Sequence, residues 1–69
     1  MRLIELSGGI FTMLPTTEYE FLQNIVNKDM KSMNADNMSE KQIYMADSLV
    51  NYNVLDKVEN FYYLKEVHL

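Results

Sequence analysis

The sequence predicts a single small α+β domain, because helix-type and strand-type patterns alternate along a chain of 69 residues. Apolar residues recur at three- and four-residue steps over residues 16–27 and 39–51, which predicts two amphipathic helices. Residues 1–14 contain two apolar runs, the first imperfectly alternating, on either side of a glycine turn, and residues 54–67 are rich in β-branched and aromatic side chains. Both patterns predict a β-hairpin, one at each end. A chain of this length has room for one domain, so we assign residues 1–69 to it.

The N-terminal hairpin is expected to turn at Ser7-Gly8-Gly9 and to end at Pro15, which cannot donate a ladder hydrogen bond. Thr17 and Glu20 then stand at the spacing of a capping box, which predicts the start of the first helix. The residues expected on its buried face are Phe21, Leu22, Ile25 and Val26.

The second helix has a clearer start, because Ser39 and Gln42 form another capping box. Its end is expected near Asn51, since Asn51 and Asn53 tolerate left-handed backbone angles better than most residues. The residues that recur on its apolar face are Ile43, Ala46, Leu49 and Val50.

After this helix, residues 54–58 and 61–67 are expected to pair as strands, with Glu59-Asn60 as their short connection. The segment before the helix, residues 28–38, leaves two alternatives open. Its first half has the composition of a short helix, whereas Asn34 to Asn37 is typical of a turn or an extended loop.

The stretch MADSLVNYNVLDKVENFYYLKEV, residues 45–67, resembles the second half of a winged-helix domain. The stretch LPTTEYEFLQNIV, residues 14–26, resembles the start of the winged-helix domains of response regulators. The resemblance implies that helix 39–51 is the recognition helix and that the C-terminal hairpin is the wing. The residues that carry it in the second half are Ala46, Leu49, Val50, Asn53, Leu55 and Tyr62 to Leu64.

Composition excludes several kinds of chemistry. The chain has no cysteine and one histidine, His68, so disulfides, thiolate zinc sites and Cys-His or Ser-His-Asp nucleophiles are not expected. No motif for a cofactor or a metal is present, and we expect a protein that is not an enzyme. Without a signal-peptide pattern or a long apolar run, we expect a cytoplasmic protein that does not enter the membrane.

A net charge of −4 is spread over the chain and leaves no basic stripe. The most promising recognition surface is the outer side of the second helix together with the wing, where Tyr44 is expected beside Lys41 and Ser48. The candidate partner-binding residues are Glu40, Lys41, Tyr44, Asp47, Ser48, Asn51 and Lys57.

Two functions remain open, and the same surface would serve either. A winged-helix DNA-binding regulator would depend on Lys41 and Lys57, but acidic residues neighbour both, and phosphate neutralisation supplies most non-specific affinity. We therefore favour a small acidic protein that binds a partner protein, with a homodimer as a further possibility. Its composition, rich in Asn, Met and Tyr, resembles small bacteriophage and mobile-element proteins, many of which inhibit or redirect a host protein.

Overall fold

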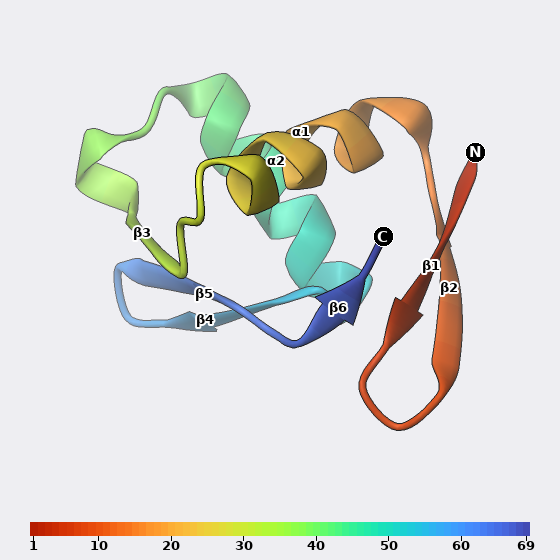
Figure 1. The fold of residues 1–69 in the computed structure, drawn as a ribbon. Coiled ribbons are helices and arrows are strands. Elements are labelled where there is room, and N and C mark those ends of the chain that lie inside the picture. The colour runs from red at the N-terminus through yellow and green to blue at the C-terminus, as the bar shows by residue number, and fades with distance from the viewer.

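The computed structural model describes residues 1–69 and contains two α-helices, one short 3₁₀-helix and six strands in two small sheets (Figure 1). The architecture confirms the predicted α+β class, with a hairpin near each end and two main helices between them. In chain order the elements are β1 (Arg2–Leu6), β2 (Ile10–Leu14), α1 (Thr16–Asn27), β3 (Ser32–Asn34), η1 (Ala35–Asn37), α2 (Glu40–Asn51), β4 (Leu55–Val58), β5 (Phe61–Leu64) and β6 (Val67–His68).

The first sheet has the strand order β2-β1-β6 and the second has the order β3-β5-β4, with antiparallel pairing throughout. In the view of Figure 1 the second sheet lies below the helices, and the β1-β2 hairpin stands beside them. The chain leaves the second sheet after Leu64 and enters the first sheet at Val67. A link of two residues therefore ties the two sheets together.

The N-terminal hairpin forms as predicted. Leu6 lies opposite Ile10, so the connection consists of Ser7, Gly8 and Gly9. The φ angles of Gly8 and Gly9 are 83° and 77°. These left-handed conformations are open to glycine without steric cost, which explains why the turn falls at this point.

The first helix begins at Thr16 as expected, but the predicted capping box of Thr17 and Glu20 is wrong. The N-cap is Pro15, and no side chain caps the helix. Thr17 is therefore already inside the first turn, where its hydroxyl donates to Glu18 Oε1 at 2.6 Å. Glu18 is buried near the positive end of the helix dipole, which favours its carboxylate.

The predicted inner face of α1 is correct for Leu22 and Ile25, which are buried. It is wrong for Val26, which is exposed. Successive helix residues are turned by about 100°, so a side chain directly after Ile25 points well away from the core. Phe21 is half-buried at the border of the core.

The second helix confirms its predicted capping box. The backbone N–H of Gln42 donates to Ser39 Oγ at 3.2 Å, and the backbone N–H of Ser39 donates to Gln42 Oε1 at 2.8 Å. The helix ends at Asn51, and Asn53 takes the expected left-handed conformation with a φ of 64°. The N–H of Val54 then donates to the carbonyl of Leu49, which closes the corner.

Residues 28–38 were expected to form either a short helix or an extended loop, and they form neither of these throughout. Ser32–Asn34 is strand β3, which pairs with β5, and Ala35–Asn37 is one turn of 3₁₀-helix. Asn34 caps this turn, because its side chain accepts a hydrogen bond from the N–H of Asp36. The strand exists because β5 offers an open edge, which is a long-range property.

The C-terminal hairpin is shorter than the predicted strands 54–58 and 61–67. Its strands are Leu55–Val58 and Phe61–Leu64, joined by the predicted two-residue turn with Glu59 at a φ of 55°. The remaining residues of the second predicted strand cross to the first sheet. There, β6 pairs with β1, with Leu6 opposite Val67.

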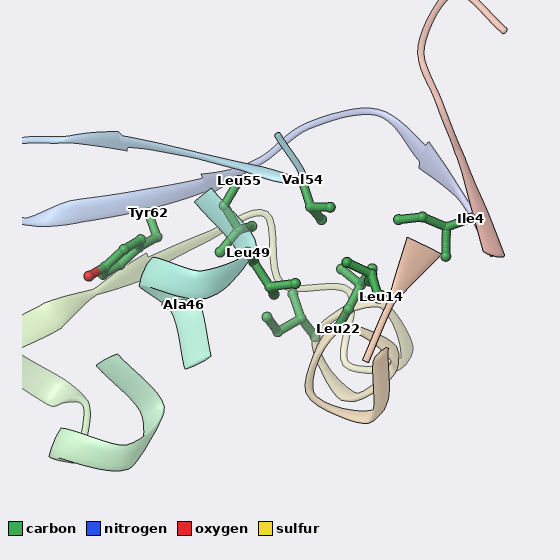
Figure 2. Close-up of a cluster of buried hydrophobic side chains, with 9 residues drawn as sticks. Ile4, Leu14, Leu22, Ala46, Leu49, Val54, Leu55 and Tyr62 are labelled. Carbon is green, nitrogen blue, oxygen red and sulfur yellow. The ribbon is translucent and has the colours of Figure 1, made fainter. Parts of the chain in front are cut away.

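Nine buried apolar side chains from both helices and both sheets form one core (Figure 2). Leu49 of α2 occupies its middle, with Leu22 of α1 on one side and Leu55 of β4 on the other. The remaining members are Ile4, Leu14, Ile25, Ala46, Val54 and Tyr62. A domain of about this size buries only ~60% of the surface of its unfolded chain, so each of these side chains matters.

Replacing Leu49 by Ala should lower the free energy of unfolding by about 2–5 kcal/mol, because it opens a cavity at a fully buried position. Leu3→Ala is the matched control, since Leu3 is largely exposed and should lose less than about 1 kcal/mol. Urea unfolding followed by circular dichroism measures both. Equal losses in the two variants would contradict the assigned core.

Candidate functional site

One side of α2 faces solvent and meets the β4-β5 hairpin at its edge. Four residues spaced three or four apart, Glu40, Tyr44, Asp47 and Asn51, are exposed on this side, and we call them the α2 outer face. Tyr44 is the most exposed large apolar side chain of the chain, at 73%. The α2 outer face thus presents an aromatic ring between two carboxylates.

Asp47 is the point where α2 and the hairpin are joined through polar groups. The hydroxyl of Tyr62 on β5 donates to Asp47 Oδ1 at 2.5 Å, within the range of charge-assisted hydrogen bonds. Lys57 Nζ on β4 lies 3.8 Å from the same oxygen and 5.3 Å from the centre of the Tyr62 ring. Lys57 stands directly opposite Tyr62 in the strand pair, which explains how one lysine reaches both groups.

The Tyr62 ring is fully buried, while its hydroxyl points away from the aliphatic core side chains (Figure 2). Burial raises the pKa of this hydroxyl, and the hydrogen bond and the negative charge of Asp47 raise it further, from 10.0 to about 12. The phenol therefore stays protonated at neutral pH. In that state it is a hydrogen-bond donor that holds Asp47 in place.

Five of the seven candidate residues lie together, and two do not. The α2 outer face and Lys57 adjoin one another around Asp47. Lys41 instead lines a small hollow of about 240 Å³ against α1, together with Thr17, Glu20 and Met45. Ser48 is half-buried and offers less surface than expected.

Lys57 and Lys65 are engaged in ion pairs, whereas Lys41 of α2 is in none. Lys57 pairs with Asp47, and Lys65 pairs with Asp56 at 3.3 Å. Glu40 is in no such ion pair, and neither is Glu59 in the β4-β5 turn. Such exposed pairs add little stability, but they offset positive charge that would otherwise face a partner.

A second hollow, which the sequence did not indicate, has a volume of about 450 Å³ and lies between α1 and the β3-η1 segment. Met30, Met33 and Met38 line it, with Phe21 beside them. These methionines also pack partly against the core. Methionine is flexible and fills irregular gaps, which fits the half-buried position of these three side chains at the border of the core.

No group of three or more His, Cys, Asp or Glu side chains is arranged to hold a metal ion. Neither α1 nor α2 has the length and apolar composition that crossing a bilayer requires. The polar contacts around Asp47 are the principal candidate site.

Comparisons with known proteins add no identification. A scan of protein-family models and searches of curated proteins and of solved structures each find no match to this chain. The class of protein is therefore inferred from the fold and from the α2 outer face alone.

Tyr62→Phe should lower the free energy of unfolding at neutral pH by about 1–2 kcal/mol, because the hydrogen bond to Asp47 is lost. The pKa of Tyr62 is higher in the folded state than in the unfolded state. Its contribution is therefore present below pH 10 and is lost as the pH rises towards about 12.

The measurement is urea unfolding of the wild type and of Tyr62→Phe from about pH 8 to about pH 12. The difference in free energy of unfolding between the two proteins should become smaller as the pH rises across this range. Tyr63→Phe is the control, since it removes the same hydroxyl from an exposed residue of the same strand. If the difference in free energy of unfolding between wild type and Tyr62→Phe stays constant with pH, the role assigned to the Tyr62 hydroxyl is contradicted.

Proposed function

We propose that this chain is a non-enzymatic, cytoplasmic interaction protein that binds a basic surface of a partner protein through the α2 outer face. The observation that carries the proposal is the pairing of Lys57 with Asp47 and of Lys65 with Asp56. Glu40 and Glu59 are in no ion pair, and Glu40 lies one helical turn before the exposed Tyr44. Lys41 is also in no ion pair, but it lines the hollow against α1. The surface is thus suited to lysines and arginines of a partner.

Tyr44 supplies the contact area that charge alone does not. Tyrosine is enriched at interface hot spots, because its ring is large and rigid and its hydroxyl finds a hydrogen-bond partner. Acidic side chains around it steer a basic partner to the surface and raise the association rate. The composition supports a modulator of the phage type, which inhibits or redirects a host protein by occupying such a surface.

We further propose that the fold is winged-helix-like, with α2 in the place of the recognition helix and the β4-β5 hairpin as the wing. The close contact of α2 with this hairpin through Asp47 and Tyr62 supports the proposal. The departure from the pattern is the segment before α2, where one 3₁₀ turn, η1, stands where the family has a full helix. A DNA-binding helix-turn-helix needs two helices at a fixed angle, so this departure weakens the DNA-binding alternative.

DNA binding is the second candidate, because a helix beside a hairpin is a common arrangement in proteins that read the major groove. The charges oppose it. Over residues 40–64, Glu40, Asp47, Asp56 and Glu59 outnumber Lys41 and Lys57, which gives a charge of −2.

Tyr44→Ala and Glu40→Lys should each reduce capture of the partner by at least about tenfold, the effect of a hot-spot residue. The assay uses tagged protein incubated with host lysate, and the bound proteins are quantified by mass spectrometry. Tyr63→Ala and Glu66→Lys are the matched controls, because both residues are exposed but lie outside the α2 outer face. Loss of capture in the controls alone would place the binding surface elsewhere.

A random-sequence duplex DNA tests the alternative. Fluorescence anisotropy at about 0.15 M salt should show affinity no tighter than roughly 10⁻⁴ M, the weak end of non-specific binding. Tighter binding that falls steeply with added salt, and that Lys41→Glu abolishes, would favour the nucleic-acid function.

A further inference from the structure

Strand β2 is an open edge of the first sheet. The strand order β2-β1-β6 gives it a single partner, β1, and in Figure 1 no other element lies along its outer side. Backbone N–H and C=O groups that point away from β1 are therefore left without a strand to pair with. Such an edge is a template for another strand.

The other sheet edges of this protein are protected against pairing with a further strand, whereas the β2 edge is not. Strand β3 has three residues and β6 has two, so neither offers a long ladder. Strand β4 carries Asp56 and Lys57, both held in ion pairs. By contrast, β2 has five residues, Ile-Phe-Thr-Met-Leu, with no charge and no proline. The usual devices against strand addition are missing only here.

The distribution of charge along the chain limits which strands can pair with β2. The chain has a net charge of −4, so two copies repel one another over most of their surfaces. The stretch from Leu6 to Thr17 contains no charged residue and is the longest such stretch in the sequence. This edge is thus the place where two acidic copies can approach without repulsion. Strand β2 itself offers no carboxylate to attract a basic segment, and the one carboxylate of the hairpin, Glu5, is on β1 opposite Phe11.

The outer face of the hairpin adds apolar side chains to the open edge. Leu3 and Met13 lie directly opposite one another and are 58% and 46% exposed, and Phe11 on the same face is 59% exposed. Their neighbours on the other face, Ile4 and Leu14, are in the core. The outer face thus groups three exposed apolar side chains, with the half-buried Glu5 opposite Phe11 as its charged residue.

We propose that a second copy of this chain pairs with β2 in antiparallel orientation about a two-fold axis at Thr12. Phe11 of one copy then lies opposite Met13 of the other, and Ile10 lies opposite Leu14. The two three-stranded sheets join into one continuous sheet. This register keeps the apolar outer faces on the same side, whereas a slip by one residue would turn one of them over.

The size of the contact sets the strength of the dimer. A standard interface buries ~800 Å² per partner, whereas the whole surface of this chain is 4642 Å². A five-residue strand is only ~17 Å long, so the pairing buries less than the standard area. The dimer accordingly dissociates at low concentration, with a Kd of roughly 1–100 μM. The inference is independent of the proposed function, because the α2 outer face takes no part in it.

A single cysteine tests the register, since the chain contains none of its own. Directly opposite residues of antiparallel strands have Cα atoms about 4.5–5.5 Å apart, within the range of a disulfide. Under mild oxidation Thr12→Cys should form a dimer of twice the 8.1 kDa monomer mass at least about tenfold faster than Val58→Cys. Val58 is the control because it is an exposed residue of the protected β4 edge.

Sedimentation equilibrium tests the strength of the contact. Phe11→Lys and Met13→Lys each place a charge beside the edge and should raise the Kd at least about tenfold. Val58→Lys makes the same change at a similarly exposed residue and should leave the Kd unchanged. Circular dichroism checks that each variant is folded. If the lysine variants fail to fold, the cysteine cross-link decides.

Three results would overturn the proposal. The first is a wild-type chain that stays monomeric up to about 1 mM, well above the expected Kd. The second is cross-linking of Thr12→Cys no faster than that of Val58→Cys. The third is an equal effect of Val58→Lys and Met13→Lys on association, which would indicate a contact that does not involve β2.

Discussion

The packing of α2 between α1 and the second sheet is the constraint on which the rest of this structure depends. Leu49 lies in the middle of the core, with Leu22 of α1 on one side and Leu55 of β4 on the other. A domain this small has no second layer of apolar residues to compensate for a poor contact at this point. The orientation of α2 about its own axis is therefore determined by Ala46 and Leu49.

That orientation also determines the surface available to a partner. With Leu49 inside, Asp47 emerges beside the β4-β5 hairpin, where Tyr62 and Lys57 meet it. Lys57, one of the two lysines that a nucleic-acid contact would need, is thus engaged by the protein itself. Tyr44, one turn earlier, is left exposed at the centre of the acidic α2 outer face. The packing of α2 in the core thus determines which of its side chains are available at the surface.

The elements that the sequence predicted well are those made by local interactions. The Ser39–Gln42 capping box involves neighbouring residues only, and it formed as expected. The prediction for Thr17 used the same rule and was wrong, because Pro15 in an extended conformation took the N-cap position. A capping pattern marks a region of the chain, and the backbone conformation before it chooses the residue.

Local periodicity and turn chemistry thus determined the two helices, the two hairpins and the acidic character of this protein. Tertiary structure alone decided the rest. Strand β3 forms because Ser32–Asn34 pair with β5, and β6 forms because Val67 and His68 pair with β1. Tertiary structure likewise brings Lys57 beside Asp47 and leaves β2 at the edge of its sheet. Such contacts join residues that are far apart in sequence, and no local pattern specifies their partners.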